Sequence, residues 1–473
     1  MEEHSSMTVA PKNMAILVGG GPAPGINSVI SAATIRGIID GVDIIGIKDG
    51  FKWIMRGDIS HIKELNIDNV SRIHFRGGSY IGIARENPTK DKKYLENVVT
   101  SLLRLNVDKL ITIGGDDTAF SAMKVEELAA GRIRVVHVPK TIDNDLDLPH
   151  GICTFGFQTA RHVGVNIVKN LMVDAQTTSR WYFVVSMGRK AGHLALGIGK
   201  SAGSTLTIIP EEFPEETIKL KKLVDILVGA IIKRLSSERP DGVAILAEGL
   251  VERLDQKDLE FLLNIERDAH DNIRLAEVNF GEILKFHVQD ELKKFGLKAT
   301  IVAKNIGYEL RCSDPIPFDM EYTRDLGYCA AQFLIDGGNG AMISIQEGRF
   351  VPMYFGDIID PVTKRTKVRM VDTQSEYYQI SRRYMLRLTK EDFEDPHELA
   401  KYAATAGISL EAFRKRFYYI AESDVWTMPD LNPGKFPRKN HHHETPEVTL
   451  DESTEKLPAE KSHHETGKGK RSK

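Results

Sequence analysis

Short apolar runs alternate with longer stretches of helical spacing along most of the 473-residue chain. The run 14–18 is wholly apolar, and the runs 110–113 and 133–138 are mostly apolar, which favours strands buried on both faces. Between the last two runs, residues 119–130 have the apolar spacing of a helix. A strand, a helix and a second strand in this order predict two parallel strands whose following loops lie at the same carboxyl edge of one sheet.

The same alternation continues along the chain and predicts a second sheet that faces the first across a cleft. Further strands are predicted at residues 43–47, 180–186, 205–209, 243–247, 299–303 and 341–345. Further helices are predicted at residues 28–39, 94–105, 155–173, 216–235, 280–295 and 323–335. We also expect a proline-rich turn at 314–318, a hairpin tip at 346–350 and two short helices between 392 and 422. The predicted fold class is α/β.

Composition limits the partners and the compartment. Lys and Arg number 63 against 66 Asp and Glu, so the net charge gives no reason to expect nucleic acid or an anionic membrane surface. No apolar run approaches the roughly 20 residues that span a bilayer, and the first residues lack the apolar core of a signal peptide. We therefore expect a cytoplasmic protein.

The cysteines and the C-terminal histidines give little indication of metal or redox chemistry. Cys153, Cys312 and Cys329 have no C-x-x-C spacing and are expected to be free thiols. The histidines at 441–443 lie in residues 431–473, where apolar residues are scarce and Pro, Lys, Glu and Thr dominate. We expect this polar tail to be disordered.

Glycine, acidic and basic residues gather in the loops that follow the predicted strands. These loops are GGGPAPGIN from Gly19, RGGSYIGIAR from Arg76, GGDDT from Gly114, PKTIDND from Pro139 and MGRKAGH from Met187. Glycines let the backbone approach a ligand, whereas aspartates can hold a cation or take a proton. Each loop alone has a simpler interpretation, as a tight turn, a capping aspartate or a surface arginine. Their combination predicts phosphoryl transfer.

Four of these motifs, GGGPAPGIN, GGDDT, PKTIDND and MGRKAGH, occur in the order and with the spacing of the phosphofructokinase A-type family. The chain resembles this family from Gly19 to Arg311. Its GGDDT and PKTIDND motifs resemble the pyrophosphate-dependent branch, because ATP-using relatives generally have glycine at the positions of Asp117 and Lys140. The resemblance implies a magnesium-dependent, reversible transfer of a phosphoryl group from pyrophosphate to the 1-hydroxyl of fructose 6-phosphate, which gives fructose 1,6-bisphosphate and phosphate.

The resemblance also implies an architecture of two doubly wound, Rossmann-like domains with the active site in the cleft between them. The donor domain would comprise residues 14–157 and about 310–372, and the sugar-phosphate domain residues 158–309 and about 373–430. In the family a cationic residue matching Arg180 comes from the neighbouring subunit. A homodimer or homotetramer with shared sites is therefore expected.

The functional residues of the family carry over position by position. The implied donor-binding residues are Gly20, Arg85, Gly115, Asp117 and Thr118, and the implied magnesium residue is Asp116. The implied catalytic residues are Asp143 as the base, Lys140, Asp145, which would orient the loop or the cation, and Arg189. The implied substrate-binding residues are Thr141, Ile142, Asp143, Arg180, Met187, Gly188, Arg189, Glu248, Tyr308 and Arg311.

Two positions depart from the family pattern on the side of the sugar 6-phosphate. Tyr308 stands where ATP-using relatives have histidine, and Val302 stands where a cation is expected. Lys298 and Lys304 are the candidates to replace that cation.

Several alternatives remain open. Lys140 could act on the transition state, or it could form a structural ion pair with Asp117. The chain could be an ATP-dependent 6-phosphofructokinase, a sedoheptulose-7-phosphate kinase of the same fold, or a regulatory subunit without catalysis. The presence of Arg85, Asp116 and Asp143 favours a catalyst over a regulatory subunit.

Overall fold

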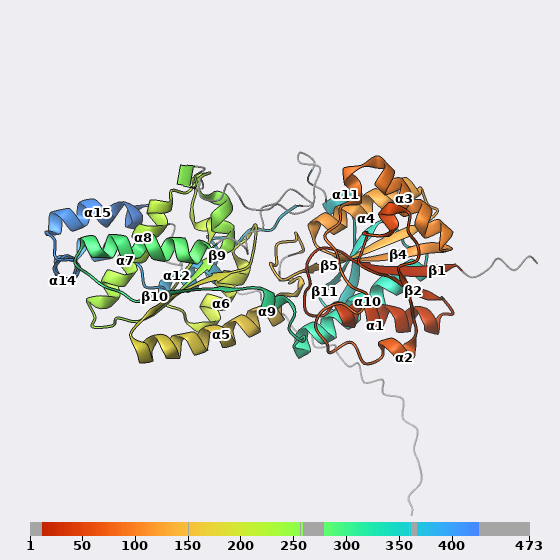
Figure 1. The fold of residues 1–473 in the computed structure, drawn as a ribbon, viewed down its shortest axis with the longest axis horizontal. Coiled ribbons are helices and arrows are strands. Elements are labelled where there is room, and N and C mark those ends of the chain that lie inside the picture. Colours follow the sequence, from red (N-terminus) through yellow and green to blue (C-terminus); the bar gives the residue numbers. More distant parts are fainter. Residues whose placement is uncertain are drawn as a thin grey trace, which may run out of the picture. The chain divides into compact units, whose positions relative to one another are not determined.

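The computed structural model describes residues 12–149, 151–255, 257–258, 279–358, 360 and 367–424. The predicted polar tail, with its histidines, lies outside the described residues. The described part of the chain forms two β-sheets with helices on both faces (Figure 1), which confirms the α/β class. The predicted domain boundaries remain a prediction.

The larger sheet has eight strands and contains the central unit of the sequence. Its strands are β1 (Asn13–Val18), β2 (Ile44–Ile47), β3 (Ile62–Leu65), β4 (Val107–Gly114), β5 (Arg134–Thr141), β6 (Phe155–Gly156), β11 (Ala341–Gln346) and β12 (Arg349–Tyr354). The order is β12-β11-β5-β4-β1-β2-β3, with β6 paired to β5. Strands β2, β1, β4, β5 and β11 are parallel, whereas the outer strands β3 and β12 pair antiparallel with their neighbours. The carboxyl ends of β1, β4 and β5 therefore lie together.

The smaller sheet is wholly parallel. It consists of β7 (Trp181–Ser186), β8 (Leu206–Ile208), β9 (Gly242–Ala247) and β10 (Ile301–Ile306), in the order β10-β7-β9-β8. The carboxyl ends of the neighbouring strands β7 and β9 carry the loops that begin at Met187 and Glu248.

Longer helices cover the sheets and shorter ones connect or cap them. They are α1 (Ile26–Ile39), α2 (Ile67–Val70), α3 (Lys92–Arg104), α4 (Asp116–Ala129), α5 (Phe157–Thr178), α6 (His193–Ala202), α7 (Leu220–Leu235), α8 (Phe280–Lys294), α9 (Tyr308–Arg311), α10 (Pro317–Ile335), α11 (Phe355–Ile358), α12 (Glu376–Tyr384), α13 (Lys390–Glu394), α14 (Pro396–Thr405) and α15 (Leu410–Glu422). Short 3₁₀ helices occur at Ile54–Arg56, Pro88–Lys90, Pro210–Glu212 and Glu248–Arg253. None of the helices in the described ranges has the length and apolar character needed to cross a membrane.

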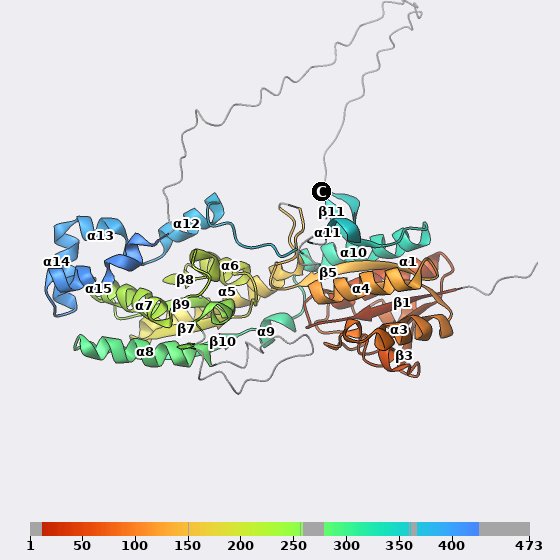
Figure 2. The same ribbon diagram turned by 90° about the horizontal axis from the view of Figure 1, so that it is seen from above.

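Helices on both faces explain why the central strands are apolar at most consecutive positions. In β1, Ile16 packs in the core with α1 and α10, whereas Leu17 packs in the core with α3 and α4. Figures 1 and 2 show these two helix pairs on opposite sides of the larger sheet. In β7, Val184 faces α5 and α6, whereas Phe183 faces α7 and α8. Alternate residues of each strand are thus buried on opposite faces.

Several element boundaries differ from the sequence prediction. The aspartates of GGDDT were predicted in a loop but lie in the first turn of α4, and residues 139–141 were predicted in a loop but complete β5. Helix α10 begins at Pro317, inside the predicted turn, because proline fits the first helical position, where no amide donor is needed. Residues 390–422 form three helices where two were predicted.

Candidate active site

A group of cationic side chains lies against the glycine turn after β1. Lys140, at the end of β5, is only 4% exposed, and its ammonium donates a hydrogen bond of 2.5 Å to the carbonyl oxygen of Gly21. A β-carbon on Gly21 would lie 3.4 Å from Nη1 of Arg311 and 3.5 Å from Nη2 of Arg85. Burial and the nearby charge of Arg85 lower the pKa of Lys140 to about 8. The arrangement has the charge to bind a small anion with several negative charges.

Arg311 lies in a place that the sequence did not indicate. The resemblance assigns it to the side of the sugar 6-phosphate, but its guanidinium faces the glycine turn together with Arg85 and Lys140. It also stacks on the ring of Tyr308, at 4.5 Å from the ring centroid. The short helix α9 thus brings a third cation to the loops of the larger sheet.

Thr118 explains why glycines are needed at the carboxyl ends of β1 and β4. Its side chain is buried, and a β-carbon on Gly19 or Gly114 would lie 2.5 Å or 2.4 Å from its Oγ1. Those glycines let the first turn of α4 approach both strands closely. Gly115 is the residue before this turn, so the free backbone amides of the helix start lie beside the cationic group.

Asp116 and Asp117 are the first two residues of α4. The backbone N–H of Asp117 donates to Oδ1 of Asp116 at 2.9 Å, and the ammonium of Lys190 donates to Oδ2 at 2.6 Å. Burial opposes ionisation of Asp116, but the charge and hydrogen bond of Lys190 outweigh it and lower the pKa of this carboxyl. Asp116 is therefore ionised at neutral pH and is held by a lysine from the smaller sheet's loop.

The acidic loop after β5 is folded back on itself. The backbone N–H of Asp143 donates to Oγ1 of Thr141 at 3.0 Å, and Asn144 has a left-handed conformation with φ of 57°. Ile142 is buried beneath the loop. The carboxylates of Asp143 and Asp145 are consequently fixed on one short turn.

Arg369 holds this acidic loop from a distant part of the chain. Its guanidinium donates to Oδ1 of Asn144 at 2.6 Å and to the carbonyl oxygen of Ile152 at 2.8 Å. Its backbone N–H donates to the carbonyl oxygen of Asp145 at 2.8 Å. Sequence reasoning missed Arg369, because nothing in the local pattern links it to a loop more than 220 residues earlier.

Both carboxyls of the acidic loop are shifted toward the protonated form. Burial raises the pKa of Asp143, and the backbone N–H of Arg189 and the charges of Arg189 and Lys140 only partly offset this. Burial, with the charges of Asp143 and Asp116, raises the pKa of Asp145 to about 7. Two carboxyls with raised pKa values in one turn are suited to proton transfer near neutral pH.

The loop after β7 lies against the acidic loop from the side of the smaller sheet. The N–H of Arg189 points to Oδ2 of Asp143 at 3.4 Å, and the N–H of Gly188 donates to Oε1 of Glu248 at 2.9 Å. Gly188 has φ of 142°, a conformation that favours glycine, and Met187 packs against Gly307. Burial and the charge of Asp143 raise the pKa of Glu248 to about 7.

The structure thus brings together most of the residues expected at the site, but leaves others apart. Arg180 directly precedes β7 and lies at the amino edge of the smaller sheet, where its Nε is 3.8 Å from Oδ2 of Asp174. Six residues of strand, about 20 Å, separate it from the Met187 loop. Tyr308 is 52% exposed, and Lys304 is exposed in β10. Which cation completes a sugar 6-phosphate site stays a prediction.

The histidines nearest the site are not suited to proton transfer. His137 is buried between the hydroxyl of Thr112 and the carbonyl oxygen of Gly114, and burial lowers its pKa to about 3. Burial lowers the pKa of His193 to about 4. The three cysteines are free thiols, as predicted.

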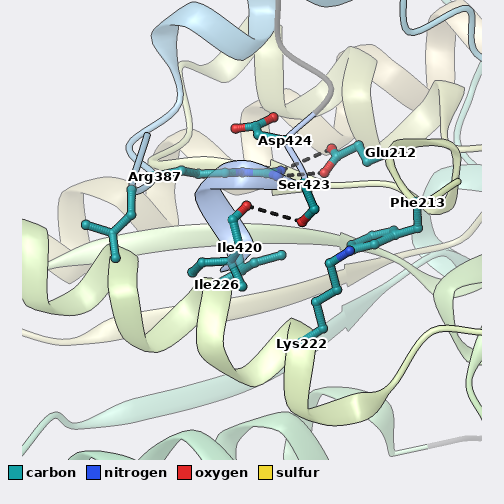
Figure 3. A pocket seen from close by; sticks show the side chains of 9 residues that line it. Glu212, Phe213, Lys222, Ile226, Arg387, Ile420, Ser423 and Asp424 are labelled. Atoms are coloured by element: carbon teal, nitrogen blue, oxygen red, sulfur yellow. Dashed lines mark hydrogen bonds and ion pairs between the residues drawn. The ribbon is translucent and has the colours of Figure 1, made fainter. Parts of the chain in front are cut away.

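A cavity of about 20 Å³ lies elsewhere, between η3 (Pro210–Glu212), α7 and α15 (Figure 3). Arg387 crosses it and forms an ion pair with Glu212, with Nη1 at 2.6 Å from Oε2. Such a volume holds about one water molecule. The cavity is too small for a sugar phosphate.

The carboxylates of the site are suited to a magnesium ion that also binds phosphate oxygens of a substrate. Among the described residues, no three His, Cys, Asp or Glu side chains are arranged as a metal cage. Mg²⁺ does not need one, because it keeps several waters and takes one or two carboxylates together with phosphate oxygens. Asp116 presents an ionised carboxylate at the start of α4, which meets this requirement.

Comparison with known proteins identifies the family. The model of the phosphofructokinase family matches residues 13–334. The chain is 51% identical over 426 residues to a pyrophosphate–fructose 6-phosphate 1-phosphotransferase of Naegleria fowleri, covering 88% of this chain and 98% of the relative. It is 50% identical over 416 residues to a protein of the same name from Thermotoga maritima, covering 87% and 99%.

A solved structure agrees at the level of the fold. The pyrophosphate-dependent phosphofructokinase of Nitrosospira multiformis superposes with a TM-score of 0.59 at 18% identity, covering 85% of this chain and 93% of that one. The chain therefore belongs to the phosphofructokinase family.

Proposed function

We propose that this chain transfers a phosphoryl group from pyrophosphate to the 1-hydroxyl of fructose 6-phosphate, reversibly and with Mg²⁺, giving fructose 1,6-bisphosphate and phosphate. The proposal rests on the convergence of Arg85, Lys140 and Arg311 on the glycine turn at Gly20 and Gly21. An acidic loop whose carboxyls have raised pKa values lies beside this turn. Relatives at 50 and 51% identity are named pyrophosphate–fructose 6-phosphate 1-phosphotransferase, which supports the donor and acceptor.

The donor would bind at the glycine turn and the start of α4. Backbone amides at Gly20, Gly115 and the first turn of α4 can approach phosphate oxygens closely. Arg85 and Lys140 would supply positive charge to a bound diphosphate. Arg311 lies at the same turn and would supply a third positive charge. Asp116 would hold the Mg²⁺ that phosphofructokinases generally use, and the ion would neutralise charge on the phosphate oxygens.

Asp143 would act as the general base on the sugar. Its carboxylate takes the proton of the 1-hydroxyl while that oxygen attacks the terminal phosphorus, and the bond to the bridging oxygen breaks. The leaving phosphate keeps the electron pair, and Lys140 stabilises its developing charge. Arg189, next to Asp143, is placed to orient the transferred group, and Glu248 to accept hydroxyl groups of the sugar. Asp145 would contribute to the charge of the acidic loop and so influence the pKa of Asp143.

Donor choice would depend on Asp117 and Lys140. A nucleotide must place its α-phosphate beside the first turn of α4, where Asp117 adds bulk and like charge to Asp116. Pyrophosphate ends before that point. The bond from Lys140 to the carbonyl of Gly21 supports a role at the donor turn.

The position of Arg180 supports a site shared between subunits. It lies at the amino edge of its own sheet, away from the loops of its own site, and is 34% exposed in its side chain. A neighbouring subunit in a homodimer or homotetramer would receive this guanidinium at its sugar 6-phosphate.

A donor comparison tests the proposal. Purified protein would be assayed with fructose 6-phosphate and Mg²⁺, with either pyrophosphate or ATP as the donor, and with Asp143→Asn as the control. We expect pyrophosphate turnover that falls by about 10² to 10⁴ in the variant. Equal use of ATP would contradict the donor assignment, and no turnover with either donor would favour the regulatory alternative.

A further inference from the structure

Lys190 joins the two sheets at the proposed metal carboxylate. It follows β7 in the loop of the smaller sheet, whereas Asp116 begins α4 beside the larger sheet. Their ion pair is short, at 2.6 Å, and both side chains are only partly exposed, at 37% and 29%. The lysine is part of the MGRKAGH motif, but neither the sequence pattern nor the assignments above give it a role.

The ammonium of Lys190 is surrounded by carboxylates, as a bound metal cation would be. Its ammonium is attracted by Asp116 first, and then by Asp145 and Asp117. Oδ1 of Asp116 already accepts the backbone N–H of Asp117, and Oδ2 accepts Lys190. Each oxygen of this carboxylate thus has a donor from the protein. A divalent ion bound directly to Oδ2 would lie within a few ångströms of the ammonium and would repel it strongly.

We propose that Lys190 is the resident counter-ion of Asp116 and that Mg²⁺ enters this site by exchange with its ammonium. The inference rests on the proposed function, because it takes Asp116 as the metal carboxylate. Before the donor arrives, the lysine neutralises the carboxylate and competes with free Mg²⁺. Mg²⁺ that comes with pyrophosphate brings additional ligands and charge, so it displaces the lysine more readily than the free ion does. Lys190 is therefore a positioning residue that couples metal binding to donor binding.

The test measures Mg²⁺ binding without turnover. Isothermal titration of Mg²⁺ into the full chain, with no pyrophosphate or sugar, would compare the wild type with Lys190→Met. Hydrogen bonds to charged groups and partly exposed ion pairs set the scale of the competition. We expect the variant to bind Mg²⁺ roughly three- to ten-fold more tightly. An unchanged dissociation constant would overturn the exchange.

A melting experiment separates exchange from a merely structural ion pair. Without metal, Lys190→Met should melt below the wild type, because three carboxylates lose their common counter-ion. Saturating Mg²⁺ should close this gap, since Mg²⁺ then occupies Asp116 in both proteins. A deficit that persists at saturating Mg²⁺ would show that the lysine stays on Asp116 and would overturn the proposal. Lys190→Gln serves as a second variant if the methionine protein folds poorly.

Two controls address general charge effects. Lys124→Met removes a cation from α4, where Lys124 pairs with Glu127 at 2.7 Å and does not touch Asp116. It should leave Mg²⁺ binding unchanged, and equal tightening would overturn the exchange. Lys190→Arg keeps the charge and should bind Mg²⁺ nearly as the wild type does. Pyrophosphate turnover is measured separately, so an inactive wild type that still shows the Mg²⁺ effects would refute the function and leave the exchange intact.

Discussion

Replacing Lys140 should stabilise the protein while it removes most of the activity. The ammonium is 4% exposed, and burial with the charges of Arg85 and Arg311 lowers its pKa to about 8, despite the opposing charge of Asp143. The folded state thus disfavours the charged lysine relative to the unfolded state, where the pKa is near the ordinary 10.5. Lys140→Met keeps an unbranched side chain of similar length and removes the buried charge.

The structure gives the size of this effect. The difference of about 2.5 between the two pKa values, at about 1.36 kcal/mol each, corresponds to a penalty of about 3 kcal/mol on the charged form. The variant also loses the hydrogen bond to the carbonyl oxygen of Gly21, which costs about 1 to 2 kcal/mol and offsets part of this gain. We expect a net stabilisation of about 1 to 2 kcal/mol at pH 7. Pyrophosphate turnover should fall by about 10² to 10³, because the cation acts on developing charge.

The stability gained by Lys140→Met should depend on pH. At pH 7, below the folded pKa, the penalty on the wild type is fully present. It shrinks as the pH rises through about 8 toward 10.5, because the lysine then loses its proton in the folded state first. The advantage of Lys140→Met should shrink over the same range.

The assay is thermal melting of ligand-free protein at pH 7 and pH 9.5, alongside turnover with pyrophosphate. Lys109→Met is the matched control, because Lys109 is also buried but pairs with Asp108 at 2.7 Å. Its loss should lower the melting temperature. The reasoning about Lys140 would be refuted by a lower melting temperature of Lys140→Met at pH 7, or by an advantage of the same size at both pH values.

Three further predictions follow from the site. The kcat/KM with pyrophosphate should fall as the pH drops below about 7, because Asp143, Asp145 and Glu248 have raised pKa values and are needed as carboxylates; a pH–rate profile that stays flat down to pH 5.5 would contradict this. Asp117→Gly should admit ATP weakly while it keeps some pyrophosphate turnover, and strict exclusion of ATP by the variant would show that other residues select the donor. Mixing inactive Arg180→Ala and Asp143→Asn subunits should restore some activity, whereas mixed oligomers that stay inactive would argue against shared sites.

The sequence by itself determined the strands and the loops that carry the chemistry. The runs at 14–18, 110–113 and 133–138 are apolar at most consecutive positions because helices cover both faces of their sheet, so the pattern alone predicted that these strands are buried, even with Thr112 and His137 among them. The glycines at positions 19 and 114 were also readable, and the structure adds that they admit Thr118. The antiparallel edge strand β3 and helix α12 were missed, because Ile62–Leu65 and Glu376–Tyr384 span only 4 and 9 residues, which is too short for a period to stand out in the sequence.

Only the tertiary structure decided which distant side chains meet. The pair of Lys190 with Asp116 joins residues 74 apart, and the clamp of Arg369 on Asn144 joins residues 225 apart. Arg311 lies at the glycine turn because α9 leads the chain from the smaller sheet back toward the larger one. The spacing of apolar residues shows which face of a helix or strand is buried. It does not show which other elements pack against that face. The contacts that tune the charge of the site arise from the order of strands and the packing of loops, which no local pattern encodes.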